Sequence, residues 1–261
     1  MSERNEYPDG MFSWVELVAT DYAKAKPFYE GIFGWEWVDI PTGENTFYHM
    51  AYVDGKEVAA AYQMYPQQLE AGVPTHWGNY VNVDSVDDAI ARAKEAGATV
   101  TVEPMDVMTA GRMAQFLDKE GAALNVWQKG DHVGAKLVNQ HGAFCWNELN
   151  TRDPKGANEF YSAVFPWKPV IEDMGGMDYT IFMLGEAMNA GAFEMTAEME
   201  GVPPHWAAYF AVDDCDATVE KAKELGGTVV MPPTDIPAGR FAVLTDPQGA
   251  VVSVIRLNPP A

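Results

Sequence analysis

The sequence contains an internal repeat, and this repeat limits the possible folds more than any other feature. Residues 74–84 are PTHWGNYVNVD and residues 203–213 are PPHWAAYFAVD, with six of the eleven positions identical. A longer match joins residues 14–38 to residues 146–170, at ten of 25 positions. Matches at a nearly constant separation along a chain indicate repeated structural units. We therefore predict two domains of the same fold within the 261 residues.

The join between the two copies lies in QKGDHVGAKLVNQHGA, at residues 128–143. This stretch is polar and contains glycine, as is typical of a connection between domains. We predict a first domain at residues 1–130, a linker at 131–141 and a second domain at 142–261.

Each domain is predicted to contain two smaller units with the same order of elements. Residues 14–19 alternate as a strand does, and Asp21 can cap the helix that follows. Residues 80–83 are strand-like too, and Asp84 or Ser85 can cap the next helix. Three short runs with strand character follow each helix. The predicted fold class is therefore α+β, with four tandem βαβββ units forming two cup-shaped domains.

Two details of the helices follow from single residues. In the second copy, Asp153 and Asp213 are expected to cap the helices. Pro27 lies inside the first predicted helix, and we expect it to kink that helix or to delay its start.

The charge and the cysteine content exclude several classes of function. There are 17 basic and 38 acidic side chains, and the net charge of −21 disfavours binding to nucleic acid or to an anionic membrane. The two cysteines have no metal-binding spacing, and a reducing compartment suits them. No basic start is followed by an apolar run, and no apolar stretch of about 18 residues occurs. We therefore expect a cytoplasmic protein.

The repeated residues resemble those of the vicinal oxygen chelate superfamily, also called the glyoxalase/bleomycin-resistance/dioxygenase fold. The motifs that carry the resemblance are Phe28-Tyr29 and Phe160-Tyr161, Phe33-Gly34-Trp35 and Phe165-Pro166-Trp167, Gly239-Arg240, and Asp246-Pro247-Gln248-Gly249. The arrangement resembles the two-domain glyoxalase-like proteins of actinobacteria. The resemblance implies a small-molecule site. The family includes lyases, isomerases, ring-cleaving dioxygenases, antibiotic-modifying enzymes and proteins that sequester drugs without catalysis, so the fold does not decide the function.

The resemblance also indicates where a metal ligand would lie. In family members that bind a metal, ligands come from the first and last strands of a unit. Those positions fall at Trp14 and Asn125 in the first copy, and at Trp146 and Ser253 in the second. Tryptophan cannot bind a cation, so the usual metal ligands of the family are mostly missing.

The resemblance implies that the face of the first strand carrying Trp14 lines the cavity, and strand parity then suggests other residues for this concave face. Side chains two apart share a face of a strand. Each copy then offers a glutamate, a histidine and a tyrosine to one cup. The candidate catalytic residues are Glu16, His76, Glu148 and His205. The candidate ligand-binding residues are Trp14, Tyr80, Asn125, Trp146, Tyr209 and Ser253.

Several hypotheses remain open for these side chains. The favoured one is a structural or ligand-orienting role in a protein that binds, sequesters or confers resistance to an apolar or aromatic compound. A second is a lyase, isomerase or dioxygenase that holds Fe, Zn, Mn or Ni through Glu16, His76, Glu148 and His205. A third is acid–base chemistry without a metal, and a fourth is a purely structural or interaction domain. The expected partner is a small molecule, and the expected state is a monomer or homodimer.

Overall fold

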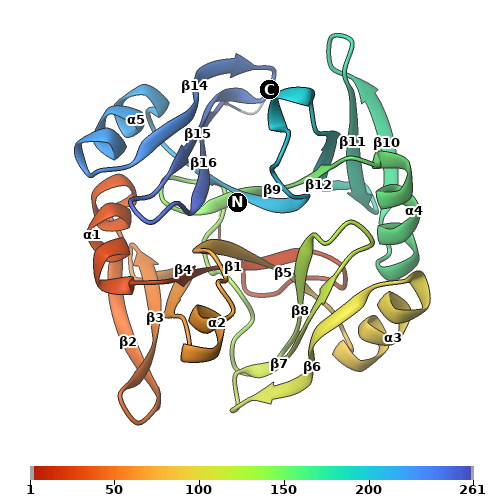
Figure 1. Cartoon of the computed structure of the whole chain (residues 1–261), viewed down its shortest axis with the longest axis horizontal. Helices are drawn as coiled ribbons and strands as arrows, with labels where there is room; N and C mark the ends of the chain where they lie inside the picture. The colour runs from red at the N-terminus through yellow and green to blue at the C-terminus, as the bar shows by residue number, and fades with distance from the viewer. Residues whose placement is uncertain (1–2, 260–261) are drawn as a thin grey trace.

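The computed structural model describes residues 3–259, which form two curled sheets of eight strands each (Figure 1). The first sheet has the order β2-β3-β4-β1-β5-β8-β7-β6, and the second has the order β10-β11-β12-β9-β13-β16-β15-β14. The first sheet contains β1 (Phe12–Ala19), β2 (Glu36–Gly43), β3 (Thr46–Val53), β4 (Lys56–Gln63), β5 (His76–Asn82), β6 (Thr99–Val107), β7 (Gly111–Leu117) and β8 (Ala123–Lys129). The second contains β9 (Phe144–Thr151), β10 (Lys168–Asp173), β11 (Asp178–Leu184), β12 (Ala187–Glu194), β13 (His205–Ala211), β14 (Thr228–Ile236), β15 (Gly239–Thr245) and β16 (Val251–Leu257). This order confirms the predicted α+β fold of tandem βαβββ units.

One helix follows the first strand of each unit, as predicted. These four helices are α1 (Tyr22–Phe33), α3 (Val86–Ala96), α4 (Pro154–Val164) and α5 (Cys215–Glu224). The short helix α2 (Pro66–Glu70) and the 3-10 helix η1 (Ala197–Met199) connect the two units of each domain.

The helix caps follow the sequence closely. The side chains of Asp21 and Asp153 each accept a hydrogen bond from a backbone N–H three residues on. Of the two candidates for α3, Ser85 is the cap. The prediction for α5 was wrong by one residue, because Asp214 caps this helix in place of Asp213.

Pro27 lies inside α1, and the expected delay of the helix start was wrong. The helix begins at Tyr22, directly after its cap. Proline has no N–H, so α1 lacks the hydrogen bond that residue 27 would donate to the carbonyl of Ala23. Burial of neighbouring helical residues, among them Phe28 and Tyr29, compensates for this loss.

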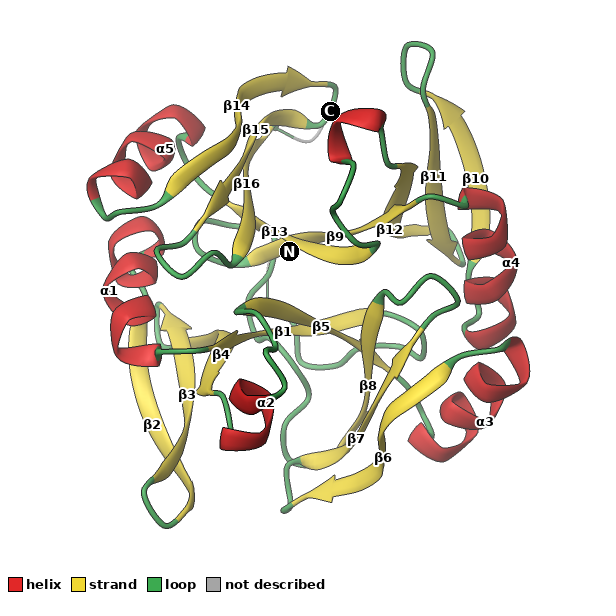
Figure 2. Cartoon of the chain, in the orientation of Figure 1, coloured by secondary structure: helices red, strands yellow, loops and turns green. Residues whose placement is uncertain are grey.

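The two sheets lie back to back across their central strands. In Figure 2, β1 and β5 run beneath β9 and β13. The amide of Asn147 donates to the side-chain oxygen of Asn79 at 2.7 Å, and Asn79 donates to the carbonyl of Trp206 at 3.1 Å. Each sheet curls away from this central seam. We call the concave face of the β1–β8 sheet the first cup, and that of the β9–β16 sheet the second cup.

The four long helices close the two sides of the seam in pairs. Helix α1 packs beside α5, and α3 packs beside α4, so each pair joins the two domains (Figure 1). Between α3 and α4 the guanidinium of Arg92 donates to the carbonyl of Val164 at 2.7 Å. Buried residues from both domains form one continuous hydrophobic core.

Hydrogen bonds cross the seam in reciprocal pairs. The indole of Trp35 in the first domain donates to the carbonyl of Gly142 at 2.7 Å, and that of Trp167 in the second donates to the carbonyl of Gly10 at 2.6 Å. Both glycines have positive φ values, of 84° at Gly10 and 74° at Gly142. The tryptophan of the FGW-like motif therefore ties each domain to the strand entry of the other.

A second reciprocal contact explains the tryptophan of the repeated phrase. Trp77 donates to the hydroxyl of Tyr29 at 3.2 Å, and Tyr29 donates across the seam to the carboxylate of Asp246 at 3.1 Å. The same relay runs in the opposite direction, at 2.8 and 2.9 Å, through Trp206, Tyr161 and Asp118. Burial raises the pKa of both aspartates.

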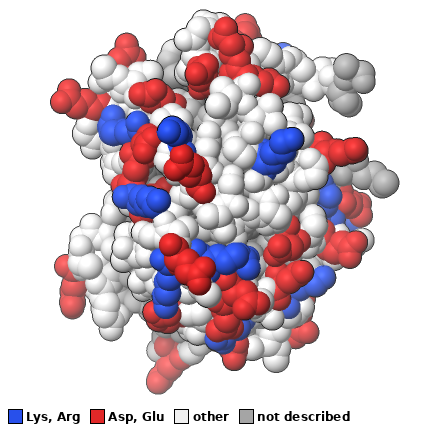
Figure 3. All heavy atoms as spheres, turned by 90° about the vertical axis from the view of Figure 1, so that its right-hand side faces the viewer, with Lys and Arg blue, Asp and Glu red and all other residues white. Residues whose placement is uncertain are grey.

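The outer surface carries the acidic charge of the chain. Figure 3 shows the face formed around α3 and α4, where acidic side chains are interspersed with fewer basic ones. Within residues 3–259, none of the helices combines the length and apolar character that a membrane span requires.

Candidate functional site

The register between β1 and β5 determines which side chains enter the first cup. The ring of Trp77 lies 4.9 Å from that of Phe210 in the other domain, so this face of β5 belongs to the seam. Tyr80 points to the opposite face and is paired with Trp14, two residues before Glu16. The structure therefore places Trp14, Glu16 and Tyr80 in the first cup, and the same register places their counterparts in the second.

The carboxylate of Glu16 is the centre of a hydrogen-bonded network at the base of the first cup. The hydroxyl of Tyr48 donates to it at 2.8 Å, and the hydroxyl of Tyr80 donates to its other oxygen. The indole of Trp14 donates to the hydroxyl of Tyr48 at 2.9 Å. Burial raises the pKa of Glu16, while the two tyrosine hydroxyls oppose this rise.

The second cup contains the same network in the same places. The hydroxyls of Tyr179 and Tyr209 donate to Glu148 at 2.7 and 2.6 Å. The indole of Trp146 donates to the hydroxyl of Tyr179 at 3.0 Å. Burial raises the pKa of Glu148 as well. Each cup thus has a buried carboxyl group that accepts hydrogen bonds from two tyrosines, and one of these tyrosines accepts a hydrogen bond from a tryptophan.

Two members of this network were missed by the sequence reasoning. Tyr48 lies on β3, which is separated from β1 by β4 in the sheet. Tyr179 lies on β11, which is separated from β9 by β12. Both side chains face the cup. Tyr48 follows an aromatic residue and Tyr179 follows an acidic one, each inside a strand-like run. The alternation of side chains between the two faces of such a strand was the signal that could have identified them.

The two histidines of the repeated phrase do not join the network. Nδ1 of His76 bonds to the carbonyl of Pro74 at 2.8 Å, and Nδ1 of His205 bonds to that of Pro203 at 2.9 Å. Burial lowers the pKa of both imidazoles, which favours the neutral form. Hydrogen bonds therefore join the predicted glutamate to the predicted tyrosine in each cup, and among the described residues none joins either histidine to them.

The two residues proposed from the last strand lie next to the network. Asn125 is paired with Tyr80, and Ser253 is paired with Tyr209. The side-chain oxygen of Asn125 accepts from Gln115 at 3.0 Å, so this amide is held by its own wall of the cup.

The donor set does not fit a metal ion. Within the described residues 3–259, no group of three or more His, Cys, Asp or Glu side chains is arranged to hold one. Both oxygens of Glu16 accept tyrosine hydroxyls, and one ring nitrogen of His76 is taken by a backbone carbonyl. The hypothesis of an Fe, Zn, Mn or Ni site built from Glu16, His76, Glu148 and His205 is therefore not supported by this arrangement.

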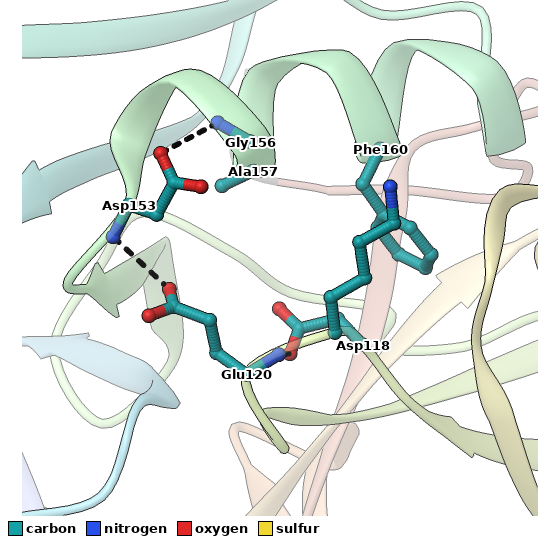
Figure 4. Close-up of a pocket in the computed structure, with 7 residues that line it drawn as sticks. Asp118, Glu120, Asp153, Gly156, Ala157 and Phe160 are labelled. Atoms are coloured by element: carbon teal, nitrogen blue, oxygen red, sulfur yellow. Dashed lines mark hydrogen bonds between the residues drawn. The ribbon is translucent and has the colours of Figure 1, made fainter.

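Two hollows of the described structure lie outside the cups. One, of about 30 Å³, lies at the start of α4 near the seam (Figure 4). Its lining includes Asp118, Glu120 and Asp153, and Glu120 accepts hydrogen bonds from the backbone N–H groups of Arg152 and Asp153. This volume holds about one water molecule, not an organic ligand. The other lies beside α3, next to Arg112.

Comparison with known proteins identifies a family and several relatives. A model of the Glyoxalase/Bleomycin resistance protein/Dioxygenase superfamily matches residues 12–126 and again residues 135–254. The chain is 44% identical over 262 residues to "Putative glyoxylase CFP32" of Mycobacterium tuberculosis (strain CDC 1551 / Oshkosh), covering 99% of each protein. It is 38% identical to the anthracycline biosynthesis protein DnrV of Streptomyces peucetius, covering 97% of this chain and 95% of that one.

Solved structures of distant sequence share the fold. The Mn(II)-bound glyoxalase from Novosphingobium aromaticivorans superposes with a TM-score of 0.66 at 17% identity, covering 98% of this chain and 83% of that one. The 2,3-dioxygenase LapB from Pseudomonas sp. KL28 superposes with a TM-score of 0.61 at 13% identity, covering 97% of this chain and 95% of that one. Likeness at this level of identity concerns the fold and leaves the chemistry open.

Proposed function

We propose that this chain, which belongs to the Glyoxalase/Bleomycin resistance protein/Dioxygenase superfamily, binds a small, planar and largely apolar compound in a cup. The observation that carries the proposal is the network of a carboxyl group, two tyrosines and a tryptophan at the base of both cups. Ligand sites in proteins typically combine apolar or aromatic side chains with a few convergent polar groups, and the network supplies aromatic rings beside one carboxyl group in each cup.

The network suits a ligand that carries a hydroxyl or carbonyl group. A carboxyl group whose pKa is raised by burial accepts a hydrogen bond when ionised and donates one when protonated. The tyrosine hydroxyls hold Glu148 in one position, so a polar group of the ligand meets a fixed partner. The indole of Trp146 offers an aromatic edge or face beside it.

The names of two relatives support a particular class of ligand. These two, from Streptomyces peucetius and Streptomyces sp. (strain C5), are named anthracycline biosynthesis proteins. Anthracyclines are planar polycyclic aromatic compounds that carry hydroxyl and carbonyl groups. We infer that the compound bound by this chain belongs to a similar chemical class, without a metal ion.

A direct test uses danthron, an uncharged planar dihydroxyanthraquinone. We expect it to quench tryptophan fluorescence equally with and without EDTA, because the network needs no metal. The double variant Glu16→Gln/Glu148→Gln should bind about 10-fold more weakly, since an amide cannot accept from both tyrosines with its two ends. The control is Arg112→Ala/Arg240→Ala, on the outer surface. Absence of quenching by the wild type, or loss of quenching on chelation, would contradict the proposal.

A second function is favoured by the raised pKa of the two glutamates. A buried carboxyl group with a raised pKa can move a proton to or from a bound carbonyl compound. Incubation with α-tetralone in D2O and EDTA would reveal this as deuterium uptake beside the carbonyl. The Glu16→Gln/Glu148→Gln variant should abolish the uptake. Equal uptake by wild type and variant would exclude such a role for the glutamates.

Other expectations from the sequence remain proposals. We propose that the chain acts in the cytoplasm as a monomer or homodimer, with domain boundaries at residues 1–130 and 142–261. Sedimentation analysis decides the oligomeric state. Separate expression of the two segments tests the boundaries, although the seam described above predicts that each segment alone exposes an apolar face.

A further inference from the structure

The two cups share a network, and in the first cup a residue of the predicted linker lies against it. His132 follows β8, and its backbone N–H donates to the carbonyl of Ala110 at 3.0 Å. Its imidazole stands edge-on to Trp14, with ring centres 4.5 Å apart and an angle of 81°. The indole of Trp127 donates to the carbonyl of His132 at 2.9 Å, which fixes the loop. Trp14 is only 3% exposed.

In the second domain the matching stretch begins at Asn258. Asn258 occupies the position of Gly130, since the two backbone N–H groups donate to equivalent carbonyls at 2.9 and 2.8 Å. Within the described residues, which end at 259, no aromatic ring lies against the indole of Trp146. Trp146 is partly exposed, whereas Trp14 is buried.

The wall of the second cup is also less polar than the wall of the first. In the first cup, Gln115 is hydrogen-bonded to Asn125, and Gln68 of α2 donates to the hydroxyl of Tyr62 at 3.1 Å. These polar groups satisfy one another and attach α2 to the wall. The equivalent positions in the second cup, taken from the matching strand registers, are less polar: Val243, Ser253 and Phe193.

The rim of the first cup is also charged. Nδ1 of His132 lies 3.6 Å from the carboxylate of Glu57 at the start of β4. The equivalent position on β12 is Met188, whose side chain is 64% exposed. A flexible, uncharged thioether adapts to apolar ligands of different shapes.

We propose that the second cup is the ligand-binding cup, that it takes an uncharged planar aromatic compound against Trp146, and that His132 excludes such a compound from the first cup. This inference rests on the proposed function and assigns it to one of two related sites. In the first cup the imidazole of His132 already lies beside the indole that a ligand would contact.

Calorimetric titration of the full chain with danthron tests the assignment. We expect one molecule bound per chain. Trp146→Phe should weaken binding by about 3- to 10-fold through loss of indole contact, and Trp14→Phe should have a smaller effect. His132→Gly should open the first cup and raise the stoichiometry to two. His132→Phe, which keeps a ring over Trp14, should retain one site and controls for disturbance of the loop.

The outcomes separate this inference from the proposed function. Two equivalent molecules bound by the wild type, or weaker binding in Trp14→Phe but not in Trp146→Phe, would overturn the assignment and leave the proposed function standing. A stoichiometry of one in folded His132→Gly would overturn the role of His132. No binding by the wild type or any variant would overturn the proposed function together with the inference.

Discussion

The seam between the domains and the walls of the cups differ in how closely the two copies agree. At the seam, Trp35 and Trp167 make the same contact in opposite directions, at 2.7 and 2.6 Å. In the cups, an amide pair in one copy is replaced by valine and serine in the other. Each seam contact uses residues of both domains, so a change in either copy disturbs both. A wall contact lies within one domain and can change alone.

At the base of the cups the two copies match each other as closely as they do at the seam, whereas at the walls they differ. Both glutamates keep two tyrosine donors, and both tryptophans keep the same hydroxyl partner. A buried carboxyl group without hydrogen bonds is costly, so the loss of one tyrosine would destabilise its domain whether or not a ligand binds there. Agreement at the base is therefore weak evidence for two working sites, and the difference between the walls is the more informative feature.

The largest predicted effect tests the symmetry of the seam. Asp246 accepts two backbone N–H groups and the hydroxyl of Tyr29, and Asp118 accepts the equivalent three donors. Replacing either aspartate by alanine should lower the free energy of unfolding by about 3 kcal/mol, because three partly or fully buried donors lose their acceptor. Urea unfolding measures both losses. A difference above about 2 kcal/mol between the variants would show that the seam is not energetically symmetric.

The next effect distinguishes the bases of the cups. A Cβ atom on Gly191 would lie 1.8 Å from the hydroxyl of Tyr179, so Gly191→Ala must displace this tyrosine from Glu148. We expect a loss of stability of about 1–3 kcal/mol and about 10-fold weaker binding of danthron. Gly78→Ala in the first cup is the matched control, because its Cβ meets only Asn125 within 3.4 Å, at 3.2 Å. Unchanged danthron binding in folded Gly191→Ala would place the ligand elsewhere.

The pH dependence of stability offers a smaller, third test. Burial raises the pKa of Glu148 above its ordinary value of 4.5. The stability contributed by the neutral buried carboxyl is present below pH 4.5 and is lost as the pH rises through the higher folded-state pKa. Wild type should therefore lose stability relative to Glu148→Gln as the pH rises above 4.5, because glutamine does not titrate.

The first cup should respond more weakly to the same test. Burial also raises the pKa of Glu16, and this rise is opposed by the hydroxyls of Tyr80 and Tyr48 and by the nearby His132, whereas only two tyrosine hydroxyls oppose the rise at Glu148. We therefore expect Glu16→Gln to remove a smaller pH dependence than Glu148→Gln does. Thermal unfolding across this pH range measures both slopes. Equal slopes would mean that His132 does not influence the first cup electrostatically.

The fold could be predicted because it follows from local signals repeated in the sequence. The caps at Asp21 and Asp153, the alternation of residues 14–19 and the duplicated phrase each specify an element or its place. Pro27 did not have the expected effect on the start of α1, because the rule that proline disrupts a helix takes no account of how its neighbours are buried. In the structure, burial of the adjacent helical face outweighs the missing hydrogen bond.

Site residues could be predicted only where the alternation of side chains along two paired strands was enough to place them on the same face. Glu16 and Tyr80 were found because their strands flank the centre of the sheet. Tyr48 was missed because two strands separate it from Tyr80 in the sheet order, which the sequence does not state. His132 lies in the predicted linker, outside the repeat, so no comparison between the copies could place it over Trp14.

The smallest predicted effect concerns a pair of residues that the copies share without using them for a ligand. Arg112 binds the carboxylates of Asp87 and Asp106, and Arg240 makes the equivalent ion pairs with Asp216 and Asp235, all on the outer surface. Exposed ion pairs contribute little because solvent and salt screen them. We expect Arg112→Ala and Arg240→Ala to leave danthron affinity unchanged and to alter thermal stability only slightly, less so in about 1 M NaCl. Reduced affinity in Arg240→Ala alone would extend the difference between the domains to their outer surface, and would mean that the ligand contacts the second domain outside its cup.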